Sequence, residues 1–298
     1  MRLLVLGRDG QVGRALAGAL APLGTVIALG REGADFSRPE TLREVVEREQ
    51  PDVIVNAAAH TAVDKAESEP DLARAINATA AGDLAEAAKA AGAWLIHYST
   101  DYVFDGTKAG PYVETDATNP LSVYGRTKRD GETAISGTGV DHLIFRTSWV
   151  HAPGGSNFIA KMLSLAQSRD ELRVIDDQIG APTSARLIAE ITRQAIARIA
   201  GGRPIETGIY HLTAAGETSW NGYARHVIGE AIRRGVVLRV TPDNVLPVPS
   251  SAFPTPAQRP MNSRLSTAKL RAALGIELPL WQEDVMGTLD TIVPERAA

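Results

Sequence analysis

A tyrosine and a lysine four positions apart, Tyr124 and Lys128, are the residues of this chain that most clearly could do chemistry together. On a helix, side chains at positions i and i+4 lie on one face, one turn apart. A lysine ammonium beside a phenol favours the phenolate, so Lys128 is expected to lower the pKa of Tyr124 from its usual value near ~10. The pair predicts a general acid or base, although the same spacing also occurs on solvated helix faces.

Thr100 adds a third member to this pair. It follows a predicted strand and is separated from Tyr124 by a loop, Asp105–Pro120, that is rich in Gly, Pro and Asp. A hydroxyl at a strand end, with Tyr and Lys on the next helix, is typical of hydride transfer to a ketone. Thr100 would hydrogen-bond the substrate carbonyl, Tyr124 would protonate its oxygen, and Lys128 would hold the nicotinamide ribose.

A glycine-rich turn near the N-terminus indicates where the hydride donor binds. Leu3–Leu6 is an apolar run typical of a buried strand, and Arg14–Leu23 has the composition of a helix. Between them stand Gly7, Gly10 and Gly13. A strand, a glycine turn and a helix form the context of a dinucleotide site, because glycine lets the backbone approach the pyrophosphate at the helix N-terminus. The spacing is GxxGxxG rather than GxGxxG.

The end of the second predicted strand, Thr25–Leu29, bears on which nicotinamide cofactor binds. Sites specific for NAD place an acidic residue there, against the adenosine ribose. This chain has Gly30 and Arg31 instead, and a cation can pair with a 2′-phosphate. The sequence therefore favours NADPH, while NADH stays possible because Glu32 or Asp35 is close enough in sequence to reach the ribose.

Alternating strands and helices predict the fold. The expected strands are 52–59, 94–98, 172–175, 210–212 and 236–240, and the expected helices are 39–49 (capped by Ser37), 63–69, 71–91, 157–168, 184–200, 219–234, 265–274 and 281–292. This order predicts an α/β protein with a Rossmann-like, doubly wound parallel sheet. We expect an NAD(P)-binding Rossmann domain at 1–147. A smaller, mainly substrate-binding lobe is expected at 148–298, with some chain returning to the first domain.

Composition excludes several other classes of protein. The 298 residues carry a net charge of −4, which gives no electrostatic case for nucleic acid as a partner. Cysteine is absent, which excludes disulfide scaffolds, thiolate metal sites and cysteine nucleophiles. No stretch resembles a signal peptide or approaches the ~20 apolar residues of a membrane span. We therefore expect a cytoplasmic enzyme with a small-molecule substrate, as a monomer or homodimer.

Longer stretches of the chain resemble one family. They are Gly7–Gly13, Val55–Asp64, His97–Gly106, Asn119–Lys128, Arg146–Val150, Asp177–Thr183 and Arg259–Leu265. In this order, and over nearly the whole chain, they resemble the extended short-chain dehydrogenase/reductases and, more narrowly, the dTDP-4-dehydrorhamnose reductase family. Val55–Asp64 and Ser99–Phe104 are the most specific of these stretches.

The resemblance implies a reaction and a set of contacts. The reaction would be NADPH-dependent reduction of the C4 ketone of dTDP-4-dehydro-L-rhamnose to dTDP-L-rhamnose, the last step of dTDP-rhamnose biosynthesis for cell-surface polysaccharide. The cofactor contacts it implies are, from pyrophosphate through adenine to nicotinamide, Gly10, Gln11, Val12, Asp35, Phe36, Ala59, His60 and Thr61. The sugar contacts it implies are Thr100, Asp101 and Trp149.

Tyr102 separates ketone reduction from elimination. Sugar-nucleotide 4,6-dehydratases resemble this chain, but after Thr-Asp they carry a Glu that removes the C5 proton. This chain has Tyr102 at that position, so proton abstraction lacks its usual base, whereas ketone reduction needs none. A dehydratase is therefore not expected.

Three questions stay open at the level of sequence. Arg259 or Arg264 can clamp the substrate diphosphate or form exposed ion pairs. Some relatives are described as metal-bridged dimers, but Ala15 and Arg186 stand where those have glutamates, so Mg²⁺ is not supported. The alternative functions are a reductase of another dTDP-ketosugar and a non-catalytic regulatory subunit on the same fold.

Overall fold

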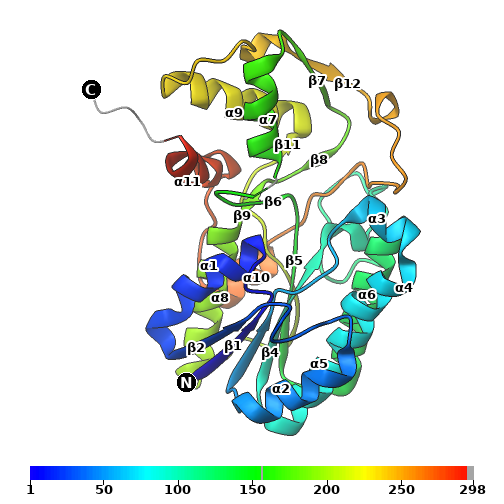
Figure 1. Ribbon diagram of the computed structural model, residues 1–298, viewed down its shortest axis with the longest axis vertical. Coiled ribbons are helices and arrows are strands. Elements are labelled where there is room, and N and C mark those ends of the chain that lie inside the picture. The colour runs from blue at the N-terminus through cyan, green and yellow to red at the C-terminus, as the bar shows by residue number, and fades with distance from the viewer. Residues whose placement is uncertain (156, 294–298) are drawn as a thin grey trace.

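A six-stranded parallel sheet forms the centre of the computed structural model, which describes residues 1–155 and 157–293 (Figure 1). Its strands are β1 (Arg2–Leu6), β2 (Thr25–Leu29), β3 (Val53–Asn56), β4 (Trp94–Thr100), β5 (His142–Thr147) and β10 (Gly208–His211). They lie in the order β10-β5-β4-β3-β1-β2, and every neighbouring pair is parallel. The predicted doubly wound parallel sheet is confirmed.

The winding of the sheet reverses between β1 and β3. From β1 the chain runs outward to β2, then crosses back to β3 on the other side of β1 and continues through β4 and β5 to β10. In open α/β sheets, ligands bind at such a switch point, outside the carboxyl ends of the strands. The topology thus places the ends of β1, β3 and β4 around one crevice.

Helices cover both faces of the sheet (Figure 1). On one face, α1 (Gln11–Leu20) packs against α8 (Ala185–Ala200), and on the other, α5 (Ala80–Ala91) packs against α2 (Leu42–Glu49) and α6 (Val123–Thr138). Successive residues of β1 alternate between the two layers, with Leu3 and Val5 in the first cluster and Leu4 and Leu6 in the second. Continuous apolar sequence in β1 is therefore explained by burial of both faces.

The helix predicted at 71–91 is three consecutive elements. They are α4 (Pro70–Arg74), a π-helical turn (Ala75–Thr79) and α5, and the shorter α3 (Val63–Ser68) precedes them. The π-helical turn contains Asn77, whose side chain is buried. Its amide oxygen accepts from the backbone nitrogen of His60 at 2.8 Å, and its amide nitrogen donates to the carbonyl oxygen of His60 at 3.1 Å. Such turns often accompany functional sites, and this one anchors the loop that follows β3.

Residues from the second half of the chain form an upper lobe over the carboxyl edge of the sheet (Figure 1). Its larger elements are α7 (Phe158–Ser168), α9 (Trp220–Arg233), α11 (Trp281–Ile292), β7 (Leu172–Ile175) and β12 (Val245–Val248). Short paired strands, β6 (Val150–His151) with β9 (Thr183–Ser184) and β8 (Ile179–Gly180) with β11 (Thr218–Ser219), lead into it. In contrast, β10, α8 and α10 (Ala268–Leu274) lie with the sheet.

Two further details differ from the sequence predictions. No strand forms at 236–240; instead β12, which was not predicted, pairs with β7. Pro247 is tolerated because this small sheet has only two strands. Ser37 does not cap a helix, because its hydroxyl donates to Asp35 at 2.7 Å, and helical structure begins with the 3₁₀ turn Pro39–Thr41.

Further 3₁₀ turns lie at Ala21–Leu23, Asp101–Val103, Pro242–Asn244 and Ser250–Ala252. Across the described ranges, no helix combines the length and the apolar character needed to cross a membrane. Ser156 and 294–298, which fall within the lobe predicted at 148–298, lie outside the described residues.

Candidate active site

The glycine turn packs too closely for side chains at two of its positions. Gly7 has φ +83°, and a Cβ there would lie 2.6 Å from the backbone nitrogen of Ala58. A Cβ on Gly13 would lie 2.0 Å from the carbonyl oxygen of Gly7. Gly10 is the N-cap of α1 and brings no side chain to the helix end. The first N–H groups of α1 are therefore left open to an anion such as a pyrophosphate.

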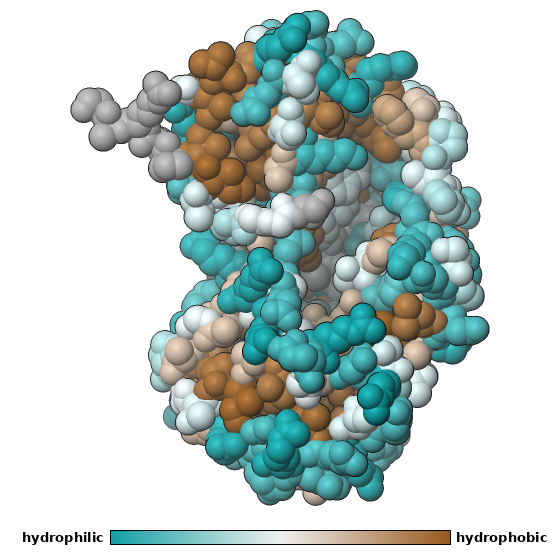
Figure 2. Space-filling view, viewed as in Figure 1, coloured by the Kyte–Doolittle hydropathy of each residue, from teal (hydrophilic) through white to brown (hydrophobic). Residues whose placement is uncertain are grey.

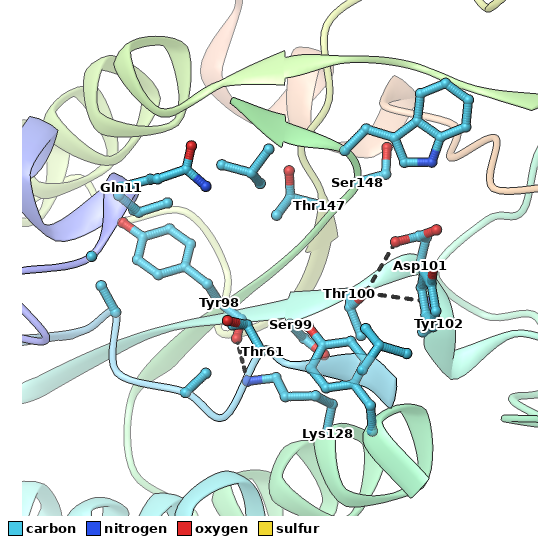
Figure 3. Close-up of a pocket in the computed structure, with 18 of the residues that line it drawn as sticks. Gln11, Thr61, Tyr98, Ser99, Thr100, Asp101, Tyr102, Lys128, Thr147 and Ser148 are labelled. Carbon is cyan, nitrogen blue, oxygen red and sulfur yellow. Dashed lines mark hydrogen bonds between the residues drawn. The ribbon is translucent and has the colours of Figure 1, made fainter. Parts of the chain in front are cut away.

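A cavity of about 440 Å³ lies at the carboxyl edge of the sheet, where the surface is hollowed between the two lobes (Figure 2). It is lined by the start of α1, the loop after β3, the ends of β4 and β5, and α6. Predicted site residues that line it are Gly10, Gln11, Val12, Ala59, Thr61, Thr100, Asp101, Tyr124, Lys128 and Trp149 (Figure 3). Residues from five separate segments thus converge on one space.

Tyr124 is held protonated in this cavity. Burial raises the pKa of its phenol to about 12, although a hydrogen bond with Thr100 acts in the opposite direction. The nitrogen of Lys128 donates to the carbonyl oxygen of Tyr98, 2.7 Å away. The expectation that Lys128 lowers the pKa of the phenol stays a prediction. A phenol with this pKa is suited to donate a proton.

Lys128 is almost fully buried, which is rare for a lysine. Burial lowers its pKa to about 8, while the nearby Glu132 raises it in part. The lysine is positioned by α6. The N-cap of this helix is Ser122, whose hydroxyl oxygen accepts from the backbone nitrogen of Gly125. This cap sets the start of the helix and hence the face on which Tyr124 and Lys128 both lie.

Asp101 and Tyr102 adjoin the triad at the end of β4. The hydroxyl of Thr100 donates to Asp101 at 3.0 Å, and burial raises the pKa of Asp101 to about 6. The Tyr102 ring meets that of Tyr124 edge to face, 5.6 Å between centroids. Tyr102 also lines the cavity.

Trp149 has an unusual backbone conformation, with φ +47°. Its ring stacks on that of Trp220 at 3.8 Å between centroids, and a Cβ on Gly180 would lie 2.7 Å from it. Stacking and close backbone packing together hold a conformation that is unfavourable for tryptophan. Both indoles line the cavity.

Seven predicted residues do not line this cavity, namely Gly7, Gly13, Arg31, Asp35, Phe36, His60 and Arg259. The His60 ring is directed toward Glu69, with 3.7 Å between Nε2 and Oε2. Phe36 is buried in the core cluster that also holds Leu4 and Leu6 of β1. Arg31 is exposed and lies 3.5 Å from the carboxylate of Asp35.

Arg259, predicted to bind substrate, donates to Asp64 at 2.8 Å. It lines a second cavity of about 1490 Å³, which is formed by the upper lobe together with residues 102–121 after β4 and shares Tyr102 and Trp220 with the first. Lys161, Arg169 and Arg173 also line this second cavity. Arg264 instead pairs with Glu217.

Comparison with known proteins agrees with this geometry. The model of a family described as "RmlD substrate binding domain" matches residues 1–293. Proteins named dTDP-4-dehydrorhamnose reductase from Shigella flexneri and Salmonella typhimurium are each 52% identical to the chain, over 100% and 95% of both sequences respectively. The chain belongs to the dTDP-4-dehydrorhamnose reductase family.

Solved structures of the family have the same fold. The enzyme of this name from Clostridium acetobutylicum has a TM-score of 0.88 at 34% identity, covering 97% of this chain and 99% of that one. That from Bacillus anthracis, in complex with NADP, has a TM-score of 0.87 at 32% identity, covering 97% and 98%. A UDP-glucose 4-epimerase from Thermotoga maritima, at 18% identity and a TM-score of 0.78, shares the fold alone.

Several residues at the site were not found from the sequence as functional. Trp220 was not among the predicted site residues, and only the fold brings it against Trp149. Asn56 and His97 stand in stretches that resemble the family, yet only the structure shows that they meet beside Lys128. Within residues 1–155 and 157–293, no group of three or more His, Cys, Asp or Glu side chains is arranged to hold a metal ion.

Proposed function

We propose that this protein reduces the C4 ketone of dTDP-4-dehydro-L-rhamnose with NADPH, producing dTDP-L-rhamnose for cell-surface polysaccharide. Full-length identity of 52% to reductases of that name supports the substrate. The observation that carries the reaction type is the convergence of Thr100, Tyr124 and Lys128 with the glycine turn on one cavity.

The residues around the first cavity fit a dinucleotide. The uncapped start of α1 suits a pyrophosphate, and a Cβ at Gly7 or Gly13 would fill the cradle beneath it. Gln11 contributes a buried side-chain oxygen with no hydrogen-bond partner in the part of the chain described. When bound, the reduced nicotinamide supplies the hydride. Ala59 and Thr61 would line its nicotinamide half.

NADPH is the proposed cofactor, with NADH as a possible substitute. Arg31 is exposed beside Gly30, at the end of β2, where an adenosine 2′-phosphate would lie. Its pairing with Asp35 is weak enough, at 3.5 Å, for the guanidinium to turn to a phosphate. The NADP complex of the Bacillus anthracis relative supports this choice.

In the proposed reaction Tyr124 is the acid. Its phenol donates a proton to the carbonyl oxygen as the ketone carbon accepts a hydride, and Thr100 hydrogen-bonds the same oxygen. Burial keeps the phenol protonated at neutral pH, because its pKa is about 12. Lys128 would bind the nicotinamide ribose. Asp101 would bind a sugar hydroxyl, and Trp149 would pack on the sugar ring.

The nucleotide part of the substrate would occupy the second cavity. It is lined by four cations, Lys161, Arg169, Arg173 and Arg259, against three carboxylates, Asp105, Asp170 and Glu171. Arginine offers a bidentate fork for phosphate, so Arg259 would leave Asp64 to bind the diphosphate. The shared residues Tyr102 and Trp220 join this cavity to the site of reduction.

The test is oxidation of NADPH, followed by absorbance, with dTDP-4-dehydrorhamnose, and identification of the product by NMR. Tyr124→Phe should lower kcat by about 10²–10⁴-fold, the usual contribution of a general acid. Undiminished turnover in that variant would remove the mechanism. Turnover with a different dTDP-ketosugar alone would favour that substrate, and no turnover with any would favour a regulatory subunit.

Three further parts of the proposal concern the roles of the two domains, the oligomeric state and the location. We propose that residues 1–147 mainly bind cofactor and 148–298 mainly bind substrate. We propose a monomer or homodimer, which sedimentation velocity distinguishes. A cytoplasmic location is proposed because the chain has no cysteine and its reaction consumes a reduced cofactor.

A further inference from the structure

Trp149 is held in a backbone conformation that tryptophan rarely adopts. Its φ of +47° lies in the left-handed region, where a Cβ comes too close to the following carbonyl oxygen. Of the described residues other than glycine, only Gln50, which follows α2, shares this conformation. It persists only where surrounding contacts hold it. Since Trp149 lines the first cavity, the contacts that hold it bear on what the cavity can bind.

Trp220, from the upper lobe, is the first of these contacts. Its indole stacks on that of Trp149, with 3.8 Å between centroids and 16° between the ring planes. Trp220 is the first residue of α9, and its ring nitrogen donates to the side-chain oxygen of Gln178 at 3.2 Å. The ring of Phe158 on α7 packs against it, 4.7 Å between centroids. Trp220 is therefore fixed from several directions and offers Trp149 a rigid aromatic face.

Gly180, in β8, is the second contact. A Cβ there would lie 2.7, 2.9 and 3.1 Å from Cε2, Cζ2 and Nε1 of Trp149, so the indole leaves no room for a side chain. The φ of Gly180 is outside the left-handed region, so its own backbone does not require glycine. Gly180 also lines neither of the two cavities. A side chain at this position would therefore act on the site through Trp149.

We propose that Trp220 and Gly180 are positioning residues for the reduction, because together they fix the Trp149 indole against which the sugar of the substrate lies. Hydride transfer requires the reacting atoms to be about 3–3.5 Å apart and aligned, so a misplaced sugar is reduced slowly. The inference rests on the proposed function for the sugar contact of Trp149. The stacking itself can be measured without substrate.

The place of the indole pair between the cavities distinguishes it from ordinary core packing. Trp149 and Trp220 are each only half-buried, and both line the cavity that holds Thr100 and Tyr124. Trp220 also lines the second cavity. A nucleotide sugar with its nucleotide in the second cavity and its ketone in the first must pass Trp220, which places its sugar beside the stack.

The first experiment detects the stack in the full chain without substrate. Two indoles in this arrangement couple their electronic transitions and give a paired positive and negative band in the far-UV circular dichroism spectrum. We expect this couplet in the wild type and the same loss in Trp149→Phe and in Trp220→Phe, because it needs both indoles. Trp94 and Trp281 are present in every variant and cancel in the difference spectra. Two unlike difference spectra, or no couplet, would overturn the proposal.

The second experiment displaces the indole from outside the cavities. Gly180→Ala should weaken the couplet and lower kcat/KM for dTDP-4-dehydrorhamnose by about 10²-fold, the usual cost of a misplacement of about 1 Å. The matched control is Gly229→Ala on α9, in the same lobe, where a Cβ would meet its nearest atom, Cγ of Pro242, at an ordinary 3.4 Å. This control should keep both the couplet and the rate. An unchanged couplet and rate in Gly180→Ala would sink the proposal.

A double variant tests whether Gly180 acts through Trp149. In Trp149→Leu the ring is already absent, so adding Gly180→Ala should lower kcat/KM little further. A full second loss would mean that Gly180 acts by another route. Urea unfolding establishes which variants are folded. If Gly180→Ala does not fold, Trp220 decides the question: Trp220→Phe keeps an aromatic face and should retain more of kcat/KM than Trp220→Leu, and equal losses would count against the proposal.

Thymidine diphosphate separates positioning of the sugar from direct binding of the nucleotide, because it carries no sugar beyond its deoxyribose. Its affinity, measured by calorimetry, should be the same in Trp220→Leu as in the wild type. If affinity falls as much as kcat/KM does, Trp220 binds the nucleotide itself and the proposal is wrong. Absence of wild-type turnover with dTDP-4-dehydrorhamnose would instead contradict the proposed function, while the couplet and its response to Gly180→Ala would still be measured.

Discussion

Loss of Arg146 should destabilise the protein more than loss of any exposed cation. Its guanidinium binds both oxygens of Glu132, at 2.9 and 2.6 Å, and the two side chains are 3% and 4% exposed. Arg146→Met keeps an unbranched apolar stem but leaves the Glu132 carboxylate buried without its partner. Breaking one side of a buried ion pair costs about 3–5 kcal/mol of the free energy of unfolding.

Urea unfolding, followed by far-UV circular dichroism at pH 7, measures this cost. The matched control is Arg74→Met, because Arg74 lies 2.9 Å from Asp130 but is 60% exposed. An exposed pair contributes about 0–1 kcal/mol, so the control should lose at most that. Similar contact distances with different burial then isolate the effect of the buried charge.

A double variant tests the cause. Arg146→Met combined with Glu132→Leu leaves neither charge unpaired, so it should recover most of the stability lost in Arg146→Met. A loss below about 1 kcal/mol in Arg146→Met would refute the reasoning. So would a double variant no more stable than the single one.

Three further results are expected. Gly13→Ala brings a Cβ to 2.0 Å from the carbonyl oxygen of Gly7, so the affinity for NADPH, measured by fluorescence titration, should fall at least tenfold. The control is Gly18→Ala on the same helix, where a Cβ meets nothing within 4 Å, and this variant should bind NADPH as the wild type does. Arg31→Asp should shift the ratio of kcat/KM values from NADPH toward NADH, and an unchanged ratio would mean that Arg31 does not meet the 2′-phosphate. The pKa of Asp101 is raised from 3.8 to about 6, so its stabilising contribution is complete below pH 3.8 and is lost as the pH rises through 6. Asp101→Asn should therefore be more stable than wild type at pH 8, by up to about 3 kcal/mol, with the gap closing near pH 4 in urea unfolding.

Much of the first half of the fold follows from local sequence. Apolar runs such as Leu3–Leu6 are strands because burial on both faces requires apolar residues throughout. The glycine turn and the spacing of Tyr124 and Lys128 are likewise local, since backbone geometry and helical periodicity fix them. Prediction was weaker at 236–240 and 245–248, because a two-stranded sheet takes its stability from neighbours rather than from strand propensity.

Contacts at the site between residues that are far apart in the sequence could not be predicted from local sequence. Trp149, which the resemblance implied as a sugar contact, stacks on Trp220, which was not among the predicted site residues and stands 71 positions away (220 − 149 = 71). Arg259 was expected on a diphosphate, yet its partner in the structure is Asp64, from the other end of the chain. Partners of this kind depend on which loops the folded sheet brings together.

The sequence by itself determined the kind of chemistry, because a hydroxyl, a phenol, an amine and a glycine turn are sufficient to indicate hydride transfer to a ketone. The protonation states were decided only by tertiary structure. Burial raises the pKa of Tyr124 and lowers that of Lys128, and the spacing of four positions does not reveal either shift. Those quantities depend on what surrounds a side chain in space, and residues as distant as Asn56 and His97 are part of that environment.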